Sequence, residues 1–183
     1  MPTFELQMRS TAEGGFAAAW FDNESHLWDD ERLSSPDSLV RTWTAPKLKL
    51  YWPDRGATSI LFNPNALAIS QGLRDELAQF SELEFLEVSI EGHGTFFILH
   101  VLTAIELPLH SNARIAPAPS GNVVEIHSFP DTFTPPTGFF RILQPVGSAA
   151  GRMNRTTRAI YLGQSGKNAI ERLASPFLEV RAR

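Results

Sequence analysis

The chain has 183 residues, of which 43% are hydrophobic and 20% are charged, and its formal net charge is −4. These values are typical of a globular protein and exclude an intrinsically disordered chain. The chain contains no cysteine, which excludes disulfide scaffolds, thiolate nucleophiles and sulfur-ligated zinc sites.

The distribution of charge along the chain is uneven. Residues 1–140 contain 18 Asp and Glu but 8 Lys and Arg. Residues 141–183 contain 2 Asp and Glu but 8 Lys and Arg. Either folding brings the two parts together and cancels much of this asymmetry, or an acidic face is available to a basic partner.

The chain is expected to act in the cytoplasm, without a membrane partner. Its first residues lack a basic region followed by an apolar run, so no signal peptide is predicted. Its longest apolar run is far shorter than the roughly 20 residues that cross a bilayer.

Before residue 66 the sequence predicts strands joined by turns. Alternation indicates a strand over residues 4–8, and a short helix is expected near residues 25–33. The next predicted strands are residues 39–43, 47–52 and 59–62.

The most regular stretch is residues 67–102. A short strand precedes a helix that begins at Ser70, a good N-cap residue, and continues to Phe80. Residues 84–91 alternate apolar and polar, and residues 95–102 are apolar on both faces. With the glycine-rich turn between them, they predict a long hairpin whose second strand lies centrally in a sheet.

Short strands also dominate the prediction for the rest of the chain. A proline-rich loop is expected over residues 108–122, an irregular segment over 129–138 and an exposed basic segment over 147–157. Strands are predicted at residues 123–127, 139–143, 159–162 and 177–180, and a helix capped by Ser165 is predicted to end at residue 173.

This order of elements predicts an α+β fold. We expect a mostly antiparallel sheet with a long central hairpin and two or three packed helices, because strands and helices do not alternate regularly enough for a doubly wound sheet. We expect one domain over residues 1–183, of which residues 1–45 are either an integral part or a loosely appended N-terminal subregion.

Residues 163–167, Gly-Gln-Ser-Gly-Lys, match part of two catalytic motifs, but their spacing excludes both. A phosphate-binding loop needs Gly where the chain has Tyr161 and Ser or Thr where it has Asn168. A nucleophile elbow needs a residue between Ser165 and the next glycine. We therefore interpret Ser165 as a helix cap beside turn glycines.

The histidines do not predict a metal or cofactor site. No pair has the helical i, i+4 spacing of a zinc site, and we expect the protein not to be an enzyme. The alternative is a small enzyme whose site combines His100, His127 and Glu125, since the two histidines lie in predicted strands and could meet across a sheet. The full set of histidines is His26, His93, His100, His110 and His127.

Carboxylates mark the candidate binding surface. They are interpreted either as a solvated edge or as a surface for a basic protein, and they comprise Glu82, Glu84, Glu87, Glu91, Asp29, Asp30 and Glu31. A nucleic-acid partner is not expected, because the basic residues Arg152, Arg155 and Arg158 lack interleaved aromatic residues.

Residues 45–175 resemble a family of immunity-like proteins encoded beside bacterial polymorphic and contact-dependent toxins. The chain departs from the family pattern at Glu87, where a proline is expected, and at Phe96–Phe97, where the family has a tyrosine. The matching residues are Trp52-Pro53, Leu67-Ala-Ile-Ser70, Leu77, Glu84-Phe-Leu86, Val88, Phe97-Ile-Leu-His-Val101, Leu109, Ser111, Phe140-Arg141 and Ile170-Glu171.

The resemblance implies a cytoplasmic protein without catalysis of its own, which binds a cognate toxin or effector and occludes its active site. The acidic part of the chain would suit a basic toxin such as a nuclease. A secretion-associated adaptor is a further alternative, and the sequence leaves the oligomeric state and the identity of any toxin open.

Overall fold

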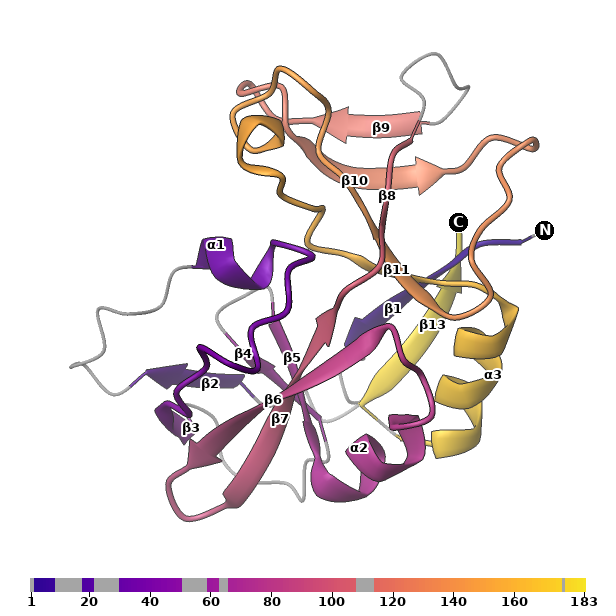
Figure 1. Ribbon diagram of the computed structural model, residues 1–183. Helices are drawn as coiled ribbons and strands as arrows, with labels where there is room; N and C mark the ends of the chain where they lie inside the picture. Colours follow the sequence, from indigo (N-terminus) through magenta and orange to yellow (C-terminus); the bar gives the residue numbers. More distant parts are fainter. Residues whose placement is uncertain are drawn as a thin grey trace.

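The computed structural model describes residues 2–8, 18–21, 30–50, 59–62, 66–107, 114–175 and 177–183. The predicted α+β class and the mostly antiparallel strand pairing are confirmed. Figure 1 shows a β-barrel at the lower left, a mixed sheet flanked by α3 at the right, and a two-stranded sheet at the top. Among the described helices, none is long and apolar enough to cross a bilayer.

The barrel is closed because each of its six strands pairs with a neighbouring strand on both sides. Pairing is parallel between β2 and β4 and between β3 and β6, and antiparallel elsewhere. The strands in barrel order are β2 (Ala18–Phe21), β3 (Lys47–Leu50), β6 (Leu83–Ile90), β7 (Gly94–Val101), β5 (Ala66–Ser70) and β4 (Ser59–Phe62).

Apolar side chains at alternate positions along the strands fill the barrel. Leu86, Val88 and Ile90 point inward from β6, and Ile98 of β7 lies opposite Leu86. Between β6 and β7, the turn places Gly92 and Gly94 at φ values of 76° and 85°, which glycine adopts without strain. The interior cluster of buried residues is Leu33, Leu39, Ala66, Ala68, Leu86, Val88, Ile90, Phe96 and Ile98.

A second sheet packs beside the barrel. Its first strand in the chain, β1, lies between two strands from the other end of the chain, and β8 pairs in parallel with β11. In sheet order its strands are β13 (Leu178–Ala182), β1 (Phe4–Met8), β12 (Ile160–Leu162), β11 (Phe139–Ile142) and β8 (Ala104–Ile105).

The main core lies between the outer face of the barrel and this sheet. Helices α2 (Gln71–Leu77) and α3 (Gln164–Leu173) contribute Leu73, Leu77 and Ile170 to it. A third, aromatic cluster around Phe140 and Tyr161 lies beside the strands β9 (Arg114–Pro117) and β10 (Val123–Ser128). The remaining elements are α1 (Asp30–Leu33) and the 3₁₀ helix η1 (Gly151–Met153).

Several local predictions need correction. Residues 39–43, predicted as a strand, form turns, and the predicted loop over residues 108–122 contains β9. The segment 147–157, predicted to be exposed, buries Ser148, Thr156 and Thr157. Residues 25–29 and 51–52 of two other predicted elements lie outside the described residues.

The predicted helix caps are also partly wrong. Ser70 occupies the N-cap position of α2, but its side chain makes no capping hydrogen bond. Helix α3 has Gly163 at its N-cap, two positions before the predicted Ser165. The first amides of α3 bond instead to the preceding chain, because the Ser165 and Gly166 N–H groups both donate to the Thr137 carbonyl.

Candidate functional site

A buried glutamate and a buried histidine lie in contact at one end of the barrel. Glu84 belongs to the inward-facing row of β6 with Leu86 and Val88, and the strand register sets it opposite His100 of β7. His100 Nδ1 lies 3.0 Å from Glu84 Oε2, and their side chains are 0% and 9% exposed. A carboxylate this deep requires further hydrogen bonds to offset its desolvation.

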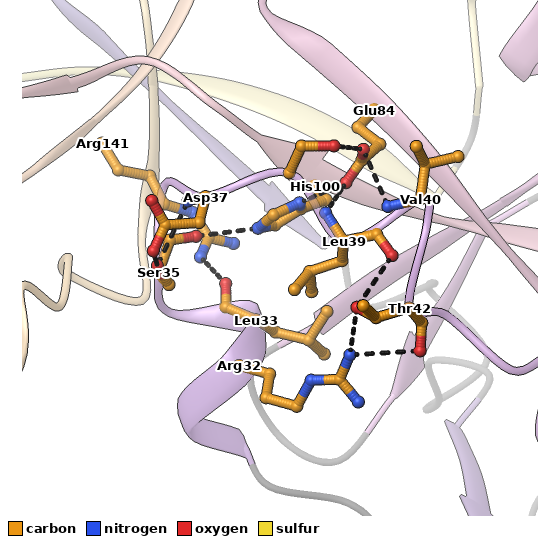
Figure 2. Close-up of polar contacts among 11 residues, drawn as sticks. Arg32, Leu33, Ser35, Asp37, Leu39, Val40, Thr42, Glu84, His100 and Arg141 are labelled. Carbon is orange, nitrogen blue, oxygen red and sulfur yellow. Dashed lines mark hydrogen bonds and ion pairs between the residues drawn. The ribbon is translucent and has the colours of Figure 1, made fainter.

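Residues 34–43, here called the capping segment, supply those hydrogen bonds. The Glu84 carboxylate accepts from the Ser38 hydroxyl at 2.5 Å, the Leu39 amide at 2.8 Å and the Val40 amide at 3.1 Å. Figure 2 shows the capping segment wrapped around the carboxylate, with Leu39 beside the pair.

These contacts set the charge state of Glu84. Burial acts to raise the pKa of this carboxyl group, but the hydrogen bonds from Ser38, from His100 and from two backbone amides outweigh burial. The pKa of Glu84 therefore lies below the ordinary glutamate value, and the group is a carboxylate at neutral pH.

His100 binds the capping segment with its second nitrogen. Nε2 lies 2.8 Å from the Ser35 carbonyl oxygen, so both ring nitrogens are engaged within the protein. The pair therefore holds backbone in place and offers neither imidazole nitrogen to a substrate in this conformation.

Both ends of the capping segment have anchors of their own. Arg141, which is buried in β11, donates to the Leu33 carbonyl at 2.7 Å. The Thr156 amide and hydroxyl donate to the Ser34 carbonyl at 2.7 and 2.9 Å. At the other end, the Trp43 indole donates to the Glu87 carbonyl at 2.7 Å.

The four candidate glutamates do not form one surface, contrary to their clustering in the sequence. Glu82 is half-buried and accepts from the Phe139 amide at 3.0 Å, and Glu84 is directed into the protein. Glu87 and Glu91 are exposed, as the alternation predicts. Asp29 lies outside the described residues, as do the side chains of Asp30 and Glu31 in α1.

The alternative enzyme site is not assembled as expected. His127 is exposed on β10, which belongs to the two-stranded sheet, and the partners of His100 are Glu84 and Ser35 rather than His127. The Glu125 side chain lies outside the described residues. Within the described part of the chain, no group of three or more His, Asp or Glu residues could hold a metal ion.

The glycine-rich residues 163–167 have a packing role. A β-carbon on Gly163 would overlap the Pro136 carbonyl oxygen, and one on Gly166 would lie 2.9 Å from the Gly138 oxygen. Lys167 bonds Glu171 at 2.7 Å along α3 and lies over the Phe4 ring. These contacts agree with a structural reading of the motif.

An open groove that the sequence did not suggest lies between the end of α2 and α3. Its volume is about 800 Å³. It is lined by Gln79, Phe80, Ser165, Asn168, Glu171 and Arg172. Helix periodicity could have indicated that Ser165, Asn168 and Arg172 share a face, but not that α2 ends beside it.

Comparison of the chain with protein-family models found no match, and comparison with curated proteins found none either.

Proposed function

We propose that this protein is a non-catalytic immunity protein of the bacterial cytoplasm, which binds a cognate toxin or effector and occludes its active site. The proposal starts from the resemblance carried by residues 45–175. The observation that supports it best is the β6–β7 hairpin, which in this proposal is the central element of the fold and the binding platform.

The hairpin combines a fixed backbone with exposed acidic side chains. On β6, Leu86, Val88 and Ile90 are at most 1% exposed, whereas Glu87 and Ser89 between them are exposed. The interior packing fixes the strand, so the backbone of the binding platform does not have to be ordered on binding. Such pre-organisation favours tight association.

The charge of this outer row suits a basic partner. Glu87 and Glu91 contribute two carboxylates, and Lys47, which is exposed on β3 and pairs with Ser89, contributes one positive charge to the same edge. Exposed charges of this kind speed association with a partner of opposite charge and select against others.

The proposal is tested with the product of the adjacent gene. We expect the tagged protein to capture that product and to restore growth of cells that express it. Lack of both capture and rescue would contradict the proposal.

Charge variants then test the platform. Glu87→Gln with Glu91→Gln should slow association by about tenfold at low salt, and Lys47→Glu should speed it. Glu76→Gln with Glu106→Gln makes the same change of charge at exposed positions outside the hairpin, and should leave the rate unchanged. Equal effects of both double variants would place the partner elsewhere on the protein.

A further inference from the structure

We propose that the Glu84–His100 pair is a proton-dependent latch: one proton shared by the pair holds the capping segment over the end of the barrel, and its loss releases the segment. This inference concerns the protein alone and does not rest on the proposed function.

The hydrogen-bond geometry fixes the number of protons. The Ser35 carbonyl can only accept, so the Nε2 atom 2.8 Å away carries a hydrogen. The Nδ1 atom lies 3.0 Å from a carboxylate oxygen, and two bare acceptors at this distance would repel. A second proton must therefore lie between His100 and Glu84.

That proton resides on the imidazole. Three further donors, from Ser38, Leu39 and Val40, point at the Glu84 oxygens and favour an ionised carboxylate. The buried state is thus an imidazolium beside a carboxylate, in which every ring N–H has an acceptor.

Among the described residues, three other charged groups close to the pair have hydrogen-bond partners of their own. Arg32 of α1 donates to Thr42, Asp37 of the capping segment accepts from Ser35, and Arg141 of β11 donates to Leu33 (Figure 2). On the β5 side, the residues that pair with β7 are Ala68, Ile69 and Ser70, which do not titrate near neutral pH. Glu84 is therefore the charged group that stabilises the proton on His100 Nδ1.

Loss of the proton would free the middle of the capping segment. Neutral His100 can keep its bond to Ser35 or its bond to Glu84, but not both. The anchors at Leu33, Ser34 and Trp43 do not titrate and remain as hinges. Between them, Leu39 would leave the cluster that fills the barrel.

Nitrogen NMR of the unmodified protein tests the proton count directly. We expect the His100 ring to show two N–H signals in the folded protein at neutral pH, with couplings across hydrogen bonds to Glu84 and Ser35. A ring with one N–H signal would overturn the proposal, whatever the behaviour of any variant.

Hydrogen exchange tests the release. Between about pH 5 and about pH 9, a range that spans ordinary histidine titration, opening of the Leu39 and Val40 amides should increase on the order of tenfold beyond the intrinsic effect of pH. Amides of Val88 and Ile98 in the barrel should not follow. Opening that is independent of pH would refute the latch.

Two variants separate His100 from the other histidines. His100→Gln cannot titrate, so opening at Leu39 and Val40 should be high and independent of pH. His127→Gln changes an exposed histidine of β10 and should keep the wild-type profile. A pH dependence that survives His100→Gln but disappears in His127→Gln would assign the effect to His127 and refute the latch.

Discussion

A single carboxylate, Glu84, connects segments that are 44 to 46 positions apart in the chain. It accepts hydrogen bonds from a hydroxyl, two backbone amides and an imidazole, which together occupy both oxygens. Because a buried charge with fewer partners would be costly, the capping segment and the carboxylate depend on each other.

Glu84→Gln preserves the shape of this side chain and removes its charge. We expect the free energy of unfolding at neutral pH to fall by about 2–4 kcal/mol, because four donors lose a shared anion. Glu76→Gln on the exposed face of α2 should change it by less than about 0.5 kcal/mol. Urea unfolding of both variants measures the difference, and equal effects would show that Glu84 does not hold the segment.

The lowered pKa of Glu84 gives this difference a pH dependence of known sign. The folded protein binds the Glu84 proton more weakly than the unfolded chain, so stability is present above the ordinary glutamate pKa and is lost as pH falls through the lowered value. The gap between wild type and Glu84→Gln should therefore narrow below about pH 4. A constant gap down to acid unfolding would contradict the assigned charge.

At the scale of elements, alanine substitution at two glycines near helix starts should change the free energy of unfolding in opposite directions. A β-carbon on Gly72 of α2 would enter open space, whereas one on Gly163, the N-cap of α3, would overlap the Pro136 carbonyl oxygen. Gly72→Ala should raise the free energy of unfolding by up to about 1 kcal/mol, since alanine favours helix. Gly163→Ala should lower it by about 2 kcal/mol or more, because backbone must move. Thermal unfolding measures both, and a neutral Gly163→Ala would show that the contact relaxes.

Elements with a local signal were predicted well. The alternation of β6 and the spacing of Leu73 and Leu77 in α2 depend on neighbouring residues, so their positions follow from the sequence. Residues 39–43 have apolar residues at strand spacing, but the segment forms turns, and Leu39 packs in the barrel interior. The strand β9 was missed because Pro117 reads as a loop residue, although a proline is tolerated in a strand with a free edge.

The candidate site was predictable only in part. The alternative enzyme reading combines His100 with His127 and Glu125, whereas His100 contacts Glu84 and Ser35 in the structure. The predicted hairpin already brings Glu84 and His100 onto paired strands, but the sequence does not show that residues 38–40 return to the same carboxylate. That return depends on contacts between distant segments, which periodicity does not encode.

At the scale of the whole molecule, an ion pair joins the two ends of the chain. Arg183 bonds Glu5 across 178 positions, and both side chains are at most 10% exposed. We expect Arg183→Ala to lower the free energy of unfolding by about 2 kcal/mol. Arg181→Ala, which removes a more exposed arginine of β13, should cost less than about 0.5 kcal/mol by urea unfolding. Equal losses for the two variants would mean that burial of the Arg183–Glu5 pair adds nothing to the free energy of unfolding.

The position of β1 between β12 and β13 has a consequence for synthesis of the protein. β1 precedes the other strands of this sheet, and its partners among the described strands, β12 and β13, follow more than 150 positions later in the chain. The barrel strands and α2 come before β12 in the chain, so the barrel can form while β1 is still without its partners. A copy whose translation stops before β12 would carry β1 as an open edge, the feature by which incomplete chains aggregate or are recognised for degradation.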